Sequence, residues 1–444
     1  MKTREVVQRE AKNAIKGNNY IGTIVMDTGT GKAKTAIDVM EDGQFKNVLI
    51  TSPRTVLKEN WSNELEKWGY VCMGDKLASE ALWRKRDYLV HIVMENIQTT
   101  YKWSEKKELL EGFDFVIMDE IHLGVTEEYG KLLIAVAELD IARVGLSATP
   151  EYAKHDKRAI YNSYLPIMYI YLDAAEHGII NKRKYIVCRY SLTNDFKVEV
   201  GTRHKRWLQG ELTQSIYWEK QLVEAQRVMT EIGSTKWFED AAKWVWKHEG
   251  NEEQKAAGSS YLRAIKGRKK FLHTLQSSIH ITTILKNYIL TNPNNKVLVF
   301  SELTEQANKL SKYTVHSNNP PDINTDHIKR FDKGEIRELT SCNSLTMGLN
   351  LKGANYAIME SYVSSDTLFK QKAGRTDRLE ADDIATIIWI VPKNTQAETW
   401  HNIVMRKVKR PEVEYFDLDK EEDIESLANE LLNERNNHRL EQPS

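Results

Sequence analysis

Residues 24–40, IVMDTGTGKAKTAIDVM, are the stretch from which the rest of the chain is best interpreted. An apolar run (TIVM), a glycine-rich turn (DTGTG) and a helical pattern (KAKTAIDVM) follow one another there. Such a turn exposes backbone N–H groups at a helix N-terminus, where an anion binds. The stretch approximates the phosphate-binding pattern G-x-x-x-x-G-K-[ST], but Met26 and Ala33 replace the first glycine and the hydroxyl residue. On its own it fits either a nucleotide site or an ordinary strand-to-helix turn.

If the turn binds nucleotide, its glycines permit the tight backbone and Lys32 reaches the β- and γ-phosphates. The expected nucleotide contacts of this loop are Thr28, Gly29, Thr30, Gly31, Lys32 and Ala33. Alanine lacks the oxygen that would normally bind Mg²⁺. Thr35 lies about 200° further around the helix and should not replace it, whereas a water could, since Mg²⁺ commonly keeps several. We therefore expect weakened metal binding and slow turnover rather than inactivity.

Apolar runs that end in polar or glycine-rich turns recur, with helical patterns between them. They form two clusters: YIGTIVM, NVLITSP, LVHIVM, FDFVIMDE and ARVGLSATP in the first third, and KVLVFSE, RELTSCNSL, YAIMES and ATIIWIVP in the last. Near-continuous apolar strands that alternate with helices are typical of parallel sheets covered on both faces. The sequence thus predicts an α/β fold with two doubly wound parallel-sheet domains. Ligands of such sheets bind beyond the carboxyl ends of the strands.

The composition is that of a folded protein of several domains: 444 residues, 41% hydrophobic, 28% charged, with 63 basic and 63 acidic side chains. Three widely spaced cysteines form neither a disulfide framework nor a metal-ligand pattern. We find neither a signal peptide nor an apolar run of membrane-spanning length. A soluble cytoplasmic protein without a membrane partner is expected.

Acidic residues follow one predicted strand directly. In FVIMDEIH, Asp119 and Glu120 come after the apolar run 115–118. One carboxylate there can hold Mg²⁺, and its neighbour can deprotonate an attacking water. A lone pair of this kind is more often a helix cap, but the phosphate loop earlier in the chain favours the catalytic interpretation.

Two further groups of polar residues are suited to linking two parts of the protein that move and to stabilising charge on a phosphoryl group. Ser147 and Thr149, in VGLSATP, can hydrogen-bond two moving parts. Gln371, Arg375 and Arg378, in QKAGRTDR, lie in the second cluster, and an arginine from there can neutralise charge on a transferred phosphoryl group. Taken alone, the VGLSATP segment would be an ordinary turn. Taken alone, the QKAGRTDR segment would be a solvated, salt-bridged face.

Taken in order, these four segments resemble motifs I, II, III and VI of the superfamily 2 helicases and translocases, the DEAD/DEAH-box class. The segments that resemble the weaker motifs fall in place between them: Ia at 49–68, in the form of chromatin-remodeller-type and restriction-enzyme-type translocases, Ib at 93–99, IV at 297–302 and V at 343–359. Residues 168–192 resemble the crossing into the second RecA-like domain of phage and restriction-type members. The resemblance covers roughly residues 1–405 apart from an insertion.

The resemblance implies a domain organisation. RecA-like domain 1 is expected at 1–155 and domain 2 at 156–410, with a helical insertion at about 196–285 and an acidic helical tail at 411–444. The insertion contains five tryptophans, Trp207, Trp218, Trp237, Trp244 and Trp246. We interpret them as helix core rather than as base-stacking residues. The string KGRKKF (266–271) fits a phosphate contact and a solvated helix face equally well.

The resemblance also implies residue roles. Asp119 would hold Mg²⁺, Glu120 would be the catalytic base, His122 would couple the site to domain 2, and Gln8 would read adenine. Arg375 and Arg378 would be arginine fingers, and Gln371 would contact the γ-phosphate region. Contacts to the nucleic-acid backbone would come from Ser52, Pro53, Arg54, Ser301, Thr346 and Gly348.

These roles imply a nucleic-acid motor that uses ATP and Mg²⁺ in a cleft between two domains, closing with ATP and reopening after hydrolysis. It would act on DNA rather than RNA, in the host cytoplasm if phage-encoded, alongside replication, recombination or repair proteins. The alternative is a nucleic-acid-binding clamp whose ATPase has decayed. Ala33 supports this clamp hypothesis, and the presence of Asp119, Glu120 and the two arginines argues against it.

Overall fold

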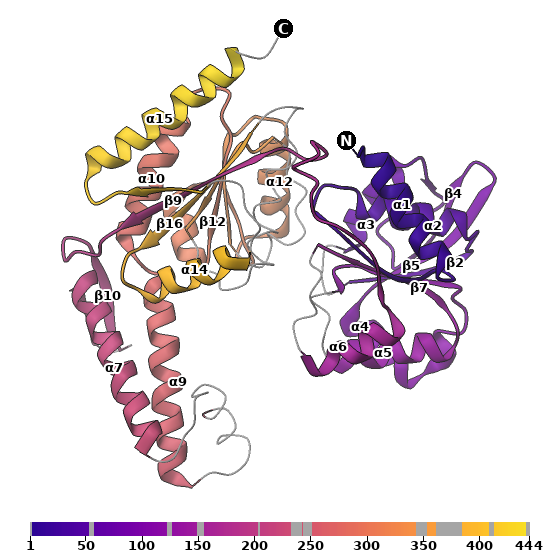
Figure 1. The fold of residues 1–444 in the computed structure, drawn as a ribbon, viewed down its shortest axis with the longest axis horizontal. Coiled ribbons are helices and arrows are strands. Elements are labelled where there is room, and N and C mark those ends of the chain that lie inside the picture. Colours follow the sequence, from indigo (N-terminus) through magenta and orange to yellow (C-terminus); the bar gives the residue numbers. More distant parts are fainter. Residues whose placement is uncertain are drawn as a thin grey trace. The chain divides into compact units, whose positions relative to one another are not determined.

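The computed structural model describes residues 2–52, 57–121, 127–148, 155–202, 205–231, 242, 251–342, 353–360, 384–407 and 413–440. The chain divides into two compact units, one formed mainly by the residues up to Arg183 and one that holds most of the chain from Lys184 onward. Each unit has its own sheet with helices packed against it (Figure 1). The predicted α/β class with two largely parallel sheets is confirmed.

The first unit is built on an eight-stranded sheet in the order β3-β4-β5-β2-β6-β7-β1-β8. Its strands are β1 (Ile21–Met26), β2 (Asn47–Ser52), β3 (Val71–Cys72), β4 (Glu80–Lys85), β5 (Tyr88–Asn96), β6 (Phe115–Met118), β7 (Ala142–Ser147) and β8 (Ile167–Tyr171). Parallel pairing joins β5, β2, β6, β7, β1 and β8, and β3 and β4 pair antiparallel at one edge. All residues of β6 are buried, which explains its uninterrupted apolar sequence.

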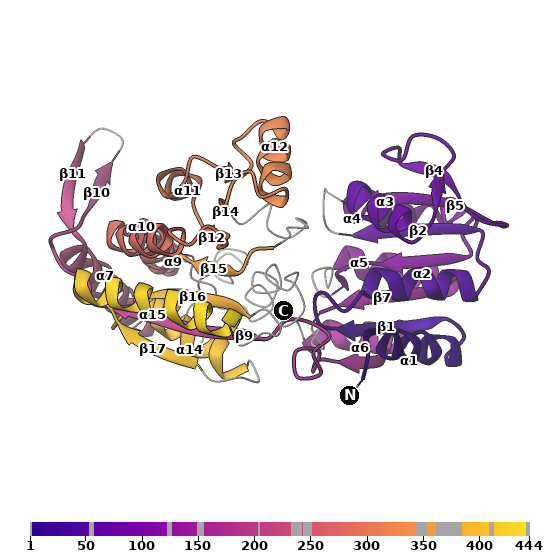
Figure 2. The ribbon, with the colours of Figure 1, turned by 90° about the horizontal axis from the view of Figure 1, so that it is seen from above.

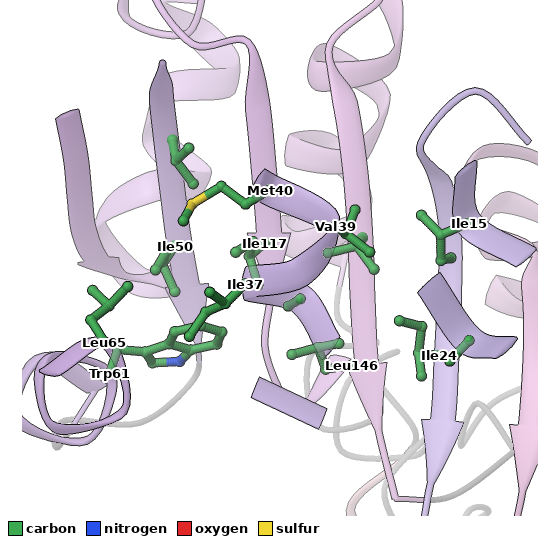
Figure 3. Packing of buried hydrophobic residues seen from close by; sticks show 14 of the residues in the cluster. Ile15, Ile24, Ile37, Val39, Met40, Ile50, Trp61, Leu65, Ile117 and Leu146 are labelled. Atoms are coloured by element: carbon green, nitrogen blue, oxygen red, sulfur yellow. The ribbon is translucent and has the colours of Figure 1, made fainter. Parts of the chain in front are cut away.

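Helices cover both faces of this sheet (Figure 1). One face carries α1 (Arg4–Gly17), α2 (Lys32–Asp42) and α3 (Leu57–Lys67), and the other α4 (Ile97–Thr100), α5 (Glu127–Glu138) and α6 (His155–Tyr164). Figure 3 shows the core under the first group, where Ile37 of α2 and Trp61 of α3 pack over Ile50 and Ile117 of the sheet.

The second unit has a seven-stranded sheet in the order β13-β14-β12-β15-β16-β9-β17. Its strands are β9 (Arg183–Tyr190), β12 (Val297–Ser301), β13 (Thr314–Val315), β14 (Glu338–Cys342), β15 (Tyr356–Met359), β16 (Ala385–Pro392) and β17 (Val413–Asp417). Its helices are α10 (Gln276–Ile289), α11 (Thr304–Leu310), α12 (Pro321–Asp332), α14 (Gln396–Lys407) and α15 (Glu421–Leu440). Alternate residues of β12 and β15 pack against α10 and α15 in one core.

The predicted insertion contains more than helices. A two-stranded antiparallel hairpin, β10 (Lys197–Thr202) and β11 (Lys205–Gly210), precedes the long helices α7 (Glu211–Glu231) and α9 (Glu252–Leu272), which pack against each other. Trp218 is partly buried against the second core, whereas Trp207 is 50% exposed. Trp237, Trp244 and Trp246 lie outside the described residues. In the basic string, Arg268 pairs with Glu219 at 3.1 Å, and the lysines are exposed.

The unit boundaries differ from those expected from the sequence. The first unit continues past residue 155, because β8 pairs in parallel with β1 and completes that sheet. The segment 411–444 contributes β17, which pairs with β9, and α15, whose Leu427 is buried in the second core. It is therefore part of the second unit rather than a separate tail.

Candidate nucleotide site

Three neighbouring strands bring the phosphate loop and the acidic pair to one edge of the first sheet. β7 lies between β6 and β1, with Ser147 opposite Val25 and Gly145 opposite Met118. Because the three strands are parallel, the residues after each strand meet at the same edge. Asp27, Ala148 and Asp119 are these next residues. The structure thus places motif I, motif III and motif II side by side.

The loop between β1 and α2 has the backbone of an anion-binding turn. Gly29 and Gly31 take φ angles of 88° and 94°, a left-handed conformation that glycine adopts without steric cost. Gly31 is the N-cap of α2, and no side chain caps the helix there. The Lys32 ammonium lies back across the loop and donates to the carbonyls of Met26 and Asp27 at 3.0 and 3.3 Å. The helix N-terminus and the lysine together suit a bound phosphate.

Gln8 of α1 lies directly against this loop. Its side-chain nitrogen donates to the Thr30 carbonyl at 2.9 Å, and a Cβ atom at Gly31 would lie 2.1 Å from that nitrogen. The φ angle of Gly31 requires glycine, and a side chain there would also displace the Gln8 amide. Gln8 was selected from the sequence as an adenine-reading residue, and the structure places its amide beside the phosphate loop.

Asp27 anchors the other side of the loop, a role that sequence reasoning did not assign. Its carboxylate accepts from the Ala174 N–H at 3.2 Å, and its own N–H donates to the Tyr171 carbonyl at 3.2 Å. Burial, with Asp173 and Asp27 nearby, raises the pKa of Tyr171, so that its phenol stays neutral. No local sequence signal links residues so far apart.

The oxygen that Ala33 lacks is not supplied by Thr35. The Thr35 side chain is fully buried, and its hydroxyl donates to the Gly31 carbonyl at 3.1 Å, inside the first turn of the helix. Ala33 itself packs partly against the core. Replacement of Ala33 by serine would therefore add the one hydroxyl that this turn lacks at that position.

The acidic pair is held by backbone and by an indole. The Asp119 N–H donates to the Thr51 carbonyl at 2.8 Å, and the Asp119 carboxylate accepts from Trp61 Nε1 at 3.2 Å and from the Glu120 N–H at 2.9 Å. Trp61, on α3, is a positioning residue that sequence reasoning missed. Glu120 has a φ angle of 50°, which is uncommon for a residue with a side chain. Such strain typically costs about 1–3 kcal/mol and collects at functional sites.

A metal at this edge would depend on few protein ligands. Within the described ranges, no group of three or more His, Cys, Asp or Glu side chains is arranged to hold a metal ion. The Asp119 carboxylate is nevertheless suited to Mg²⁺, which is usually bound through one or two carboxylates, waters and substrate phosphates. The Asp119 carboxylate therefore fits a metal bound in this way.

The other predicted residues fall into two groups. Ser52, Ser147 and Ser301 end β2, β7 and β12 and are each 1% exposed. The Ser301 hydroxyl donates to the buried Glu360 carboxylate at 2.7 Å, so it is engaged within the second unit. The remaining predicted residues, Pro53, Arg54, His122, Thr149, Thr346, Gly348, Gln371, Arg375 and Arg378, lie outside the described residues.

Comparison with known proteins identifies a different family in each half of the chain. Residues 2–152 match the family described as Type III restriction enzyme, res subunit, and residues 280–380 match the helicase conserved C-terminal domain. The chain is 20% identical over 388 residues to the Type I restriction enzyme EcoAI endonuclease subunit of Escherichia coli. That match covers 85% of this chain but only 44% of the relative, so the chain spans less than half of its length.

Solved structures with a similar fold include Dbp5, a helicase domain and a restriction-enzyme subunit. Dbp5 of S. cerevisiae, bound to RNA and ADP BeF3, has a TM-score of 0.57 at 13% identity, covering 96% of this chain and 93% of that one. The Hef helicase domain of Pyrococcus furiosus has a TM-score of 0.53 at 14% identity, covering 90% and 96%. A putative HsdR subunit of a type I restriction enzyme from Vibrio vulnificus has a TM-score of 0.54 at 16% identity, covering 94% and 68%.

In the part of the chain that the structure describes, no helix is long and apolar enough to cross a membrane. The phosphate loop and the acidic pair follow β1 and β6, which lie on either side of β7. Residues 2–152 match a restriction-enzyme family, and residues 280–380 match a helicase family. On these grounds the chain resembles the superfamily 2 helicases in its two matched segments and in its fold.

Proposed function

We propose that this chain is an ATP-dependent nucleic-acid helicase or translocase. The observation that carries the proposal is the shared sheet edge, where the phosphate loop after β1 and the acidic pair after β6 flank Ser147. A phosphotransferase could use the same loop, but it would not account for the helicase C-terminal family match at 280–380.

Each residue of this edge would have a distinct task. Bound ATP supplies the reactive γ-phosphoryl group, and Mg²⁺ neutralises its developing charge. The N–H groups of the loop and Lys32 would bind the phosphates, and Asp119, held by Trp61, would hold the metal. Glu120 would accept the proton of the attacking water. We further propose that Arg375 and Arg378 stabilise charge on the phosphoryl group, with Gln371 near it, as the family resemblance implies.

We propose DNA as the substrate, because both restriction-type relatives belong to enzymes that are named for restriction. Because Dbp5 is bound to RNA in its structure, any test with DNA must be compared with the same test with RNA. Ser52, Pro53, Arg54, Ser301, Thr346 and Gly348 stay proposed contacts to the nucleic-acid backbone. For Ser301 the backbone N–H is the better candidate, since its hydroxyl is engaged by Glu360. Three free cysteines favour a reducing compartment, and we propose the cytoplasm.

The direct test is the ATPase rate of the intact chain with no nucleic acid and with single-stranded DNA, duplex DNA, forked DNA and RNA. We expect stimulation, greatest with a DNA substrate, that falls as salt rises because phosphate contacts release counterions. Strand separation on the forked substrate distinguishes a helicase from a translocase. Nucleic-acid binding without any ATP turnover would instead support the decayed clamp.

Replacing Ala33 by serine should strengthen Mg²⁺ binding. The added hydroxyl would stand at the position where this loop lacks an oxygen, while Thr35 remains bonded to Gly31. We expect the Mg²⁺ concentration for half-maximal ATPase activity to fall about threefold to tenfold, in line with one added ligand contact of about 1 kcal/mol. Ala36→Ser, on the same helix but in the buried core, is the control. An unchanged Mg²⁺ dependence would show that Ala33 does not limit the site.

A further inference from the structure

The β10–β11 hairpin is a separate two-stranded sheet that precedes the long helix α7 (Figure 2). Its strands pair only with each other among the described strands, from Lys197 with Gly210 at the base to Thr202 with Lys205 near the turn. An isolated two-stranded ribbon contributes little to its own stability. Here the base is fixed, since Val198 is buried in the core of the second unit. Further out, Val200 is partly buried against the same core, and on the outer part of the hairpin Trp207 remains exposed.

Trp207 is held in place on this outer part yet remains half exposed. It lies directly opposite Val200, and its indole nitrogen donates to Gln209 at 3.3 Å. A Cβ atom at Gly201 would lie 2.9 Å from the indole ring, so the ring covers the glycine backbone. Even so, 50% of the residue is exposed. An indole fixed on one side and open on the other is prepared to stack on a planar group.

The charge on the two faces of the hairpin differs. Side chains alternate between faces along a strand, so Lys205 shares the face of Trp207, one step nearer the turn. The one acidic residue of the two strands, Glu199, lies on the opposite face and pairs there with Arg206 at 3.0 Å. The Trp207 face therefore presents an aromatic ring and a cation with no acidic neighbour on these strands.

We propose that this face of the hairpin binds single-stranded nucleic acid, with Trp207 stacked on an unpaired base and Lys205 on a neighbouring phosphate. Same-face residues of a strand are about 6.5–7 Å apart, which allows one strand to reach both groups. Aromatic stacking beside a cation binds single strands with little sequence preference. A protein partner would be favoured by a broad apolar surface, but the other large exposed side chain, Leu208, lies on the opposite face. The inference rests on the proposed function, since it adds a contact for the same substrate.

The test is equilibrium binding of a fluorescein-labelled 20-nucleotide oligothymidylate to the full chain, followed by anisotropy at several salt concentrations. Trp207→Ala should weaken binding about tenfold, whereas Trp207→Phe, which keeps an aromatic face, should stay within about threefold of the wild type. Lys205→Ala should lower the salt slope by about 0.7, the value for one phosphate contact to a single strand. A strand that carries 5-iodouridine should cross-link to Trp207 on irradiation.

The matched control is Leu208→Ala, which removes an exposed apolar side chain, 65% exposed, from the other face of the same strand. It should bind the oligonucleotide as the wild type does, and all variants should bind ATP normally. Equal losses for Leu208→Ala and Trp207→Ala would overturn the stacking proposal, as would normal binding by Trp207→Ala. If the wild-type chain binds no nucleic acid, the proposed function fails as well, so the two failures are distinguishable.

Discussion

Replacing Glu120 by glutamine is expected to lower the nucleic-acid-stimulated ATPase rate about 10²- to 10⁴-fold, the usual contribution of a general base. Glutamine keeps the size of the side chain but cannot take the proton of the attacking water. Asp119 keeps its bonds to Trp61 and to the backbone N–H of residue 120, so the metal-binding carboxylate should stay in place. The measurement is single-turnover ATP hydrolysis at saturating nucleic acid.

Binding data decide whether the loss in Glu120→Gln is chemical. ATP and oligonucleotide affinities should remain within about threefold of the wild type, since the variant removes a proton acceptor and no phosphate contact. Glu111→Gln is the control, because Glu111 is an exposed carboxylate shortly before β6. A Glu120→Gln variant that hydrolyses ATP at the wild-type rate would assign the base to another residue. Weak binding of ATP by the Glu120→Gln variant would mean that Glu120 has a structural role at the nucleotide site.

The strained backbone at Glu120 bears on this prediction. Glu120 has a φ angle of 50°, a backbone conformation that residues other than glycine, asparagine and aspartate rarely adopt. This conformation sets the direction of its side chain. The strain is maintained by what surrounds it, namely the Asp119 N–H bonded to the Thr51 carbonyl and the Asp119 carboxylate bonded to Trp61. These contacts come from β2 and α3, which follow the phosphate loop in the chain. The orientation of the acidic pair therefore depends on the packing of the whole first unit.

Most interior strands were predictable from the sequence, but the interior strand β9 and the edge strands were not. The apolar runs expected to be strands are β1, β2, β5, β6 and β7 in the first unit and β12, β14, β15 and β16 in the second. Most of their residues are buried, so apolar residues predominate in their sequences, although β14 (ELTSC) is largely polar. β8 and β17 are sheet edges with exposed Ile170 and Tyr415. The sequence of β17, VEYFD, mixes acidic and apolar residues as loops do, whereas β8, IMYIY, is an apolar run that sequence reasoning did not assign to the first sheet. The position of each edge strand in its sheet depends on pairing with a strand that is distant in the sequence, and no local sequence pattern predicts this pairing.

The same distinction applies to the site. The phosphate loop and the acidic pair are contiguous motifs, and the parallel strand order that brings them together follows from the fold class. Trp61, Asp27 and Gln8 act across the chain, through contacts separated by 58, 147 and 22 residues. Gln8 was found only through a family resemblance. Trp61 and Asp27 have common roles in cores and turns, so nothing in their local sequence marks them as supports of this edge.

Replacing Lys32 by alanine is expected to weaken ATP binding about 10- to 100-fold, the loss that follows when a charged hydrogen-bond donor is removed from a phosphate. The structure adds a second effect. The Lys32 ammonium donates to the Met26 and Asp27 carbonyls, so the variant also leaves the loop without these two bonds. We expect its nucleotide-free form to melt slightly earlier than the wild type. Calorimetric titration with a non-hydrolysable ATP analogue and thermal unfolding measure the two effects separately.

Lys34→Ala is the matched control for Lys32→Ala, because it removes the same charge from the same first turn of α2. The Lys34 side chain pairs with Asp38 and lies over the Trp68 ring, 4.8 Å from its centroid, and so it does not lie across the loop. Affinity for the ATP analogue should change by less than about threefold in this variant. Similar losses in both variants would mean that the general positive charge of the helix, rather than the reach of Lys32, binds the phosphates. Loss of affinity confined to Lys32→Ala, with the oligonucleotide still bound, is the result that assigns this loop as the phosphate-binding element of the motor.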